Sequence, residues 1–246
     1  MWMALMWGSI AGSSVVIGAL ASLFIRIPKQ VIGWIMAFGT GTLIGAAVYE
    51  LLENALDRGG ALASAVGFTG GAIVFTAIDL YISKKGGANR KRSGSRDNKG
   101  QNQQSQSGLG IFVGSVMDAI PESIMLGASL LTGNGVSIVL AVSIFLSNIS
   151  EGISSTDGLV KSGFSRRKIL LMWGAVFLCA SLSSMGGFLF LEQLTDEMEA
   201  VLGAFAGGGI IAMICSTMMP EAFEEGGPVV GFIASMGLLV SLLLDL

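Results

Sequence analysis

The sequence predicts an all-α integral membrane protein with eight transmembrane helices, and three observations support this. First, 52% of the 246 residues are hydrophobic and 13% are charged, whereas about 25% are charged in an average soluble domain. Second, apolar stretches long enough to cross a bilayer recur along the chain. Third, the basic residues gather in alternate loops. The composition excludes a soluble globular protein and a disordered chain, and the net charge of −3 gives no basic surface for nucleic acid.

A transmembrane helix needs about 20 mainly apolar residues. Charged, glycine and proline breaks divide the sequence into eight such stretches. The first lacks the basic region and the cleavage site of a signal peptide, so we expect it to be a true span. In chain order, the predicted spans are 2–25, 31–56, 61–83, 109–131, 136–160, 169–191, 200–219 and 229–244.

The charge of the loops predicts the orientation of these spans. If the N-terminus is outside, the inner loops contain thirteen of the 14 basic residues, and only Arg58 lies outside. The positive-inside rule therefore predicts that both chain ends lie outside. Aromatic belts would then have Trp34 and Trp173 near the inner interface and Trp2 and Trp7 near the outer one.

One polar segment, 84–108, interrupts the apolar pattern. It has no apolar residue beyond Ala88, so it cannot bury a core, and we expect a disordered cytoplasmic linker. A contact with lipid headgroups or a regulatory contact is the alternative. The chain is then a single membrane domain, 1–246, with spans one to three in 1–83 and spans four to eight in 109–246.

Polar side chains concentrate in the fourth and fifth spans. Ionisable residues inside a membrane are costly and usually functional. Asp118 and Glu122 are four residues apart, so both project from one face of the fourth span. Ser147, Asn148 and Glu151 lie within about one turn of each other in the fifth span and share a face. These five residues form the candidate polar site.

The short turn at 132–135 indicates the depth of this site. If the two spans pack antiparallel about the turn, Asp118 lies level with Ile149 and next to Glu151, near the bilayer centre. No Lys or Arg occurs at that depth in any predicted span. The carboxylates therefore need a compensating cation, which two protons or a divalent metal ion could supply. Neutral, protonated carboxylates that join the two helices are the alternative.

Two weaker acidic sets lie nearer the ends of spans. Glu50, Glu53 and Asp57 recur at i, i+3 and i+7 near the outer end of the second span, and Glu221 lies at the inner end of the seventh. Each set is a possible entrance or exit path for an ion. A hydrated helix face in the first case and a solvated helix end in the second are the alternatives.

The chain contains no histidine and two cysteines. Without histidine, the HExxH motif of zinc proteases and the Ser–His pair of rhomboid proteases are impossible. The Gly-x-Gly-Asp motif of presenilin-like aspartyl proteases is also absent. We therefore expect that the protein is not an enzyme and uses no organic cofactor.

Four segments together resemble the Zrt/Irt-like (ZIP) family of divalent metal transporters. IPES and SNISEG are similar to its HNxPEG-type motifs, MMPEA to its MIPE segment, and GAAVYELLENAL to its second helix. The resemblance implies inverted repeats, spans one to three and six to eight, around spans four and five. It also implies import of a divalent metal ion, such as Zn, Mn or Fe, across the plasma membrane. Glycine-rich runs would permit the close helix packing of a homodimer.

Position by position, the resemblance implies metal binding by Glu122 and Glu151, which match the family's motif glutamates. Asp118 stands where the family has a histidine ligand, and Ser147 and Asn148 occupy the first two positions of the second motif. The implied site has only oxygen donors, which suit Mn²⁺, Fe²⁺ or Mg²⁺ better than Zn²⁺. A cation-coupled carrier of a non-metal solute and a ZIP-like protein that has lost transport are the alternatives.

Overall fold

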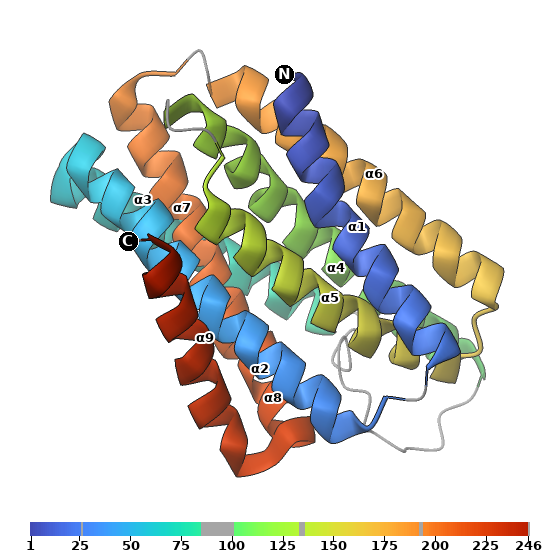
Figure 1. The fold of residues 1–246 in the computed structure, drawn as a ribbon. Helices are drawn as coiled ribbons and strands as arrows, with labels where there is room; N and C mark the ends of the chain where they lie inside the picture. Colours follow the sequence, from blue (N-terminus) through green and yellow to red (C-terminus); the bar gives the residue numbers. More distant parts are fainter. Residues whose placement is uncertain (26, 85–100, 133–135, 192–193, 246) are drawn as a thin grey trace.

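The computed structural model describes residues 1–25, 27–84, 101–132, 136–191 and 194–245, and every element in these ranges is helical (Figure 1). Most of the helices are α-helices, and two π-helical and two 3₁₀ segments interrupt them. In chain order the elements are α1 (Trp2–Phe24), α2 (Lys29–Gly45), η1 (Ala46–Glu53), α3 (Asn54–Lys84), α4 (Gln101–Ser129), η3 (Leu130–Thr132), α5 (Ile138–Lys161), α6 (Arg166–Leu191), α7 (Asp196–Met213), η4 (Ile214–Met218), α8 (Met219–Gly226), η5 (Gly227–Val229) and α9 (Val230–Asp245).

Six helical segments of the described chain are long and apolar enough to cross a membrane, by length and composition. Two of them, Lys29–Tyr81 and Asp196–Leu244, are 53 and 49 residues long. Each contains a glycine with a φ of 73°, Gly60 in the first and Gly227 in the second. Only glycine adopts this conformation without strain, so the chain can turn back there. The predicted second and third spans lie in the first segment, and the seventh and eighth in the second.

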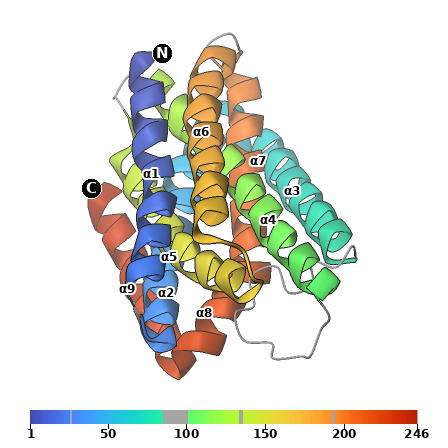
Figure 2. The same cartoon turned by 90° about the vertical axis from the view of Figure 1, so that its right-hand side faces the viewer.

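The helices form an elongated bundle in which α4, α5, α6 and α7 run in alternating directions, and α8 continues the direction of α7 (Figures 1 and 2). The start of α1 and the ends of α4 and α6 lie at one end of the bundle. The starts of α2, α4 and α6 lie at the other end.

Backbone contacts at glycine join α3 to α7 and α2 to α9. A Cβ on Gly71 would lie 1.8 Å from the carbonyl oxygen of Phe205, and one on Gly41 would lie 1.9 Å from that of Ala234. The reciprocal glycines of these two helix contacts, or seams, are Gly208 on α7 and Gly237 on α9, where an added Cβ would lie 2.0 and 2.2 Å from the facing backbone. The two seams are therefore built in the same way.

The same construction joins α1 to α5 and α4 to α6. A Cβ on Gly18 or on Gly187 would lie 2.3 Å from a carbonyl oxygen of α5 or of α4, respectively. The reciprocal glycines are Gly152 on α5 and Gly127 on α4: a Cβ on them would lie 2.4 Å from the backbone of α1 and 1.9 Å from that of α6, respectively. Close approach of helices therefore accounts for the glycines at these four contacts.

Helix α5 occupies the centre of the bundle. It contacts α1, α2, α4 and α6. In its most apolar 18-residue stretch, 72% is buried, compared with 17–56% for the same stretch in the other five spanning segments. Figure 1 shows it between α1 and α2. The fifth predicted span, which carries Ser147, Asn148 and Glu151, therefore has little contact with the surroundings of the bundle.

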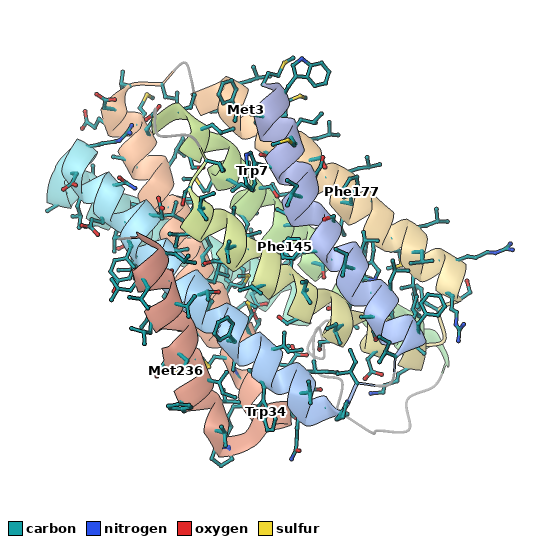
Figure 3. The ribbon with its side chains drawn as sticks, in the orientation of Figure 1. Met3, Trp7, Trp34, Phe145, Phe177 and Met236 are labelled. Carbon is teal, nitrogen blue, oxygen red and sulfur yellow. The ribbon has the colours of Figure 1, made fainter. Side chains whose placement is uncertain are left out.

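Two predictions need correction. The predicted linker 84–108 ends too late, because α4 begins at Gln101; glutamine is a good helix former and extends the helix beyond its apolar part. Residues 85–100 of the linker lie outside the described residues. Trp173 is not an interfacial residue, because it is fully buried and its Nε1 donates a hydrogen bond to Thr156 Oγ1 at 2.8 Å. Trp7 and Trp34 do lie near opposite ends of the bundle (Figure 3).

Candidate metal pathway

A contact near one end of the bundle gives the register of α4 and α5. A Cβ on Gly158 of α5 would lie 2.9 Å from Ile111 Cδ1 of α4. The two helices run in opposite directions (Figure 1), so each step along α4 corresponds to a step backwards along α5. Counting from this contact, Asp118 is level with Glu151, two residues from the predicted level. Glu122 is level with Ser147 in the same count.

All five predicted site residues are buried. Their relative exposures lie between 1% and 6%, with Ser147 the lowest and Glu151 the highest. The carboxylate of Glu122, at 2%, is among the largest fully buried side chains of the protein. Burial of this kind makes a negative charge expensive unless a cation or strong hydrogen bonds accompany it.

The serines of α5 contact three neighbouring elements, α2, η4 and α8. Ser147 Oγ lies 3.8 Å from Met218 Sδ in η4, and Ser143 Oγ donates to the carbonyl oxygen of Thr42 at 3.0 Å. Ser154 donates a hydrogen bond to the carboxylate of Glu221 in α8. Glu221, one of the predicted path residues, is therefore held beside α5 about one turn from Glu151.

Sequence reasoning missed Ser154. It lies three residues after Glu151 and seven after Ser147, so helical spacing alone could have identified it as part of the same face. Its partner Glu221 belongs to a different helix, and no pattern within α5 indicates that contact.

The acidic residues do not form one compact cluster. Within the described residues, no three Asp, Glu or Cys side chains lie close enough to hold a single metal ion. By register, Glu122 stands at one level and Asp118 with Glu151 at the next. The oxygen atoms of Ser147 and Asn148 are the additional donors at these levels. The geometry is that of a column of oxygen donors along the α4–α5 seam.

A cavity of about 270 Å³ opens beside this column. Asp118 and Glu122 contribute to its wall, and the rest of the lining is apolar and comes mainly from α3 and α7, including Phe75, Phe205 and Met213. The two carboxylates therefore lie at the border between the α4–α5 seam and the space between α4, α3 and α7.

A second cavity, of about 70 Å³, lies nearer the N-terminal end of α7. Its wall includes Glu50, Arg58 and Glu199, and Glu50 accepts a hydrogen bond from Ser137 at the start of α5.

Two of the predicted path residues, Glu53 and Asp57, are exposed and do not line this cavity. The i, i+3, i+7 spacing assumed a regular α-helix, but the π-helix η1 spans Ala46–Glu53. A π-helix has more residues in each turn, and this separates Glu50 from the face that the α-helical spacing predicted.

The fold and these buried acids define a class of protein, a multi-pass helical membrane protein with oxygen donors along its interior. No family model matches the chain. The chain is 28% identical over 240 residues to the zinc transporter ZTP29 of Arabidopsis thaliana, a match that covers 89% of this chain and 84% of that protein. The relative is named as a transporter, which agrees with the expectation that this chain is not an enzyme.

Proposed function

We propose that the protein is a ZIP-like transporter that moves a divalent metal ion toward the cytoplasm along the α4–α5 seam. The observation that carries the proposal is the burial of Asp118, Glu122 and Glu151 on two facing helices. Several carboxylates at low dielectric favour a bound cation, because the cation offsets the cost of burying their charge. The similarity to a zinc transporter supports a metal ion as that cation.

We further propose that the substrate is a transition metal of the Zn, Fe or Mn type. The donors available in the column are carboxylate, amide and hydroxyl oxygens, since the chain has no histidine. Oxygen donors favour harder divalent ions such as Mn²⁺ and Fe²⁺. The relative's name supports Zn²⁺ instead, so the choice among these metals is left to a competition experiment.

The proposed topology has eight crossings, both chain ends outside and the basic inner loops in the cytoplasm of a cell bounded by the plasma membrane. The turn-back glycines Gly60 and Gly227 and the π-helices η1 and η4 support it, because they recur at corresponding points of α1–α3 and α6–α9. The matched glycine seams favour an inverted repeat of these two groups around α4 and α5.

The proposed path has three parts. The cavity with Glu50 and Glu199 would admit the ion from outside. The column formed by Glu122, Asp118 and Glu151 would bind it. Glu221, through its contact with Ser154, would receive it on the inner side.

Metal uptake by purified protein in proteoliposomes tests this function. Glu122→Ala and Glu151→Ala should each abolish uptake, because each removes a buried ligand. Glu53→Ala and Asp57→Ala are the matched controls, since both side chains are exposed and outside the cavity, and they should transport as the wild type does. Normal uptake by both Glu122→Ala and Glu151→Ala would mean that the path lies elsewhere. Metal-independent uptake of an organic solute would favour the alternative of a solute carrier.

A further inference from the structure

We propose that the hydroxyls of Ser115 and Ser155 form a further oxygen-donor site for the metal ion or its bound water, one turn beyond Asp118 and Glu151 toward the inner end of the bundle. The proposal rests on the proposed function for the identity of the ion. Its location rests on helix geometry and on the hydrogen bonding of the two hydroxyls.

The two serines lie on the faces of α4 and α5 that meet. On α4, Ser115 follows Ile111 by four residues and precedes Asp118 by three, so it belongs to the stripe that contains both. On α5, Ser155 lies three residues before Gly158 and four after Glu151, again on one stripe. Since Ile111 contacts Gly158, these stripes face each other. The register pairs Ser115 with residue 154, within one residue of Ser155.

Both side chains are 2% exposed, and neither hydroxyl has a hydrogen-bond partner among the described residues. A serine in an apolar helix normally donates to a carbonyl oxygen one turn back. Ser150 of α5 does so, donating to the carbonyl oxygen of Ser147 at 2.7 Å, and Ser162, directly after the end of α5, donates to that of Gly158 at 2.9 Å. Ser143, Ser147 and Ser154 of α5 bond to neighbouring helices instead. Ser115 and Ser155 differ from all of these serines, because neither has a partner of either kind among the described residues.

The third buried hydroxyl of this kind has a packing explanation. Ser241 lies in the α2–α9 seam, where a Cβ on Gly45 would approach its Oγ to 2.4 Å. It lies on α9, outside the α4–α5 seam, and belongs to a close helix contact. Two of the three hydroxyls thus fall at the same level of one seam, directly beyond the proposed ligands.

The chemistry of these groups suits release of a cation. An ion that leaves two carboxylates must exchange each ligand for another oxygen, since a bare divalent ion in an apolar seam is prohibitively costly. Neutral hydroxyls bind such ions weakly and let them go, as conduction through several adjacent sites requires. Ser154 and Glu221 lie at the same level, so the pair would deliver the ion to that carboxylate.

Cadmium binding to a double cysteine variant tests whether the two side chains converge. In a background with Cys179→Ser and Cys215→Ser, the Ser115→Cys/Ser155→Cys protein should bind Cd²⁺ about tenfold or more tightly than either single cysteine variant, because two thiolates chelate one ion. The absorption of the thiolate–cadmium bond reports binding without any transport. The control pair, Ser150→Cys with Ser241→Cys, should show no such gain. Equal affinity in the double and single variants would overturn the proposal, even if the wild type transports metal.

Uptake kinetics test the role of the hydroxyls. Ser115→Ala/Ser155→Ala should lower maximal uptake about fivefold, the effect expected for the loss of one or two weak oxygen contacts, with a half-saturating metal concentration within about twofold of wild type. The double threonine variant retains both hydroxyls and should restore most of the rate, and Ser241→Ala should behave as wild type. Unchanged uptake in the double alanine variant would overturn the proposal. If the wild type itself takes up no metal, the proposed function fails, whereas chelation by the double cysteine variant still supports the convergence of the pair.

Discussion

Arg58 and Glu199 form an ion pair, with 2.7 Å between Nη1 and Oε2, that joins the early part of α3 to the first turn of α7. Both residues line the smaller cavity, together with Glu50. Arg58 is also the one basic residue that the loop charges assign to the outer side. A positive charge thus lies at the mouth through which cations would enter.

Replacement of Arg58 by glutamine should make entry of metal easier. The pair is partly exposed, so the free energy of unfolding should fall by less than about 1 kcal/mol. Removal of the positive charge should raise uptake at low metal concentration, and the gain should shrink at high salt as screening increases. Lys161→Gln is the control, because Lys161 pairs with Asp157 at the C-terminal end of α5. The cavity lies beside the N-terminal end of that helix, where Ser137 contacts Glu50. Slower uptake by Arg58→Gln would argue against this cavity as the entrance.

Introduction of histidine at position 118 should change metal selectivity. Asp118 is buried and level with Glu151, so an imidazole there would replace one oxygen donor by nitrogen. Competition assays should show Asp118→His with a higher preference for Zn²⁺ over Mn²⁺ than the wild type, because a borderline-soft donor favours the later metal. Asp118→Asn keeps an oxygen donor and should not shift the preference in that direction. An unchanged preference in Asp118→His would mean that position 118 does not contact the ion.

Metal affinity should depend on pH. Only an ionised carboxylate binds a metal ion well, so protons compete with metal for Asp118, Glu122 and Glu151. The apparent affinity of detergent-solubilised protein should therefore weaken as the pH falls, and titration calorimetry at several pH values measures this. Glu122→Gln removes one competing group and should flatten the dependence. Affinity that is the same at all pH values would exclude the carboxylate column as the binding site.

Two adjacent glycines of α6 should respond oppositely to the same substitution. A Cβ on Gly187 would lie 2.3 Å from the carbonyl oxygen of Ile124, whereas one on Gly186 meets nothing within 4 Å. Gly187→Ala must force α4 and α6 apart, and we expect a loss of about 1–3 kcal/mol. Gly186→Ala should be neutral or stabilising by up to about 1 kcal/mol, since alanine favours the helix. Thermal unfolding in detergent compares the two, and equal midpoints would contradict the close α4–α6 seam.

The sequence predicted best where regular helices decide the outcome. The spacing of Asp118 and Glu122 implied a common face, and both line one cavity. Nothing in the composition or periodicity of the sequence predicts the π-helix η1. The positions of Glu53 and Asp57 relative to Glu50 therefore could not be predicted from α-helical spacing. The contact between Ser154 and Glu221 depends on how α5 packs against α8. Tertiary contacts of this kind require the relative positions of helices, which local patterns do not contain.

The central position of α5 has a consequence for biosynthesis. From Ser147 to Asp157 this helix is mostly polar, and its buried side chains include Asn148 and Glu151. Polar and charged residues make the insertion of an isolated segment into lipid less favourable during synthesis. Helix α5 should therefore enter the bilayer together with its neighbours, sheltered by α1 and α4, which are made before it, and completed by α6, which follows. This polar span would then depend on its partners to become a transmembrane helix at all.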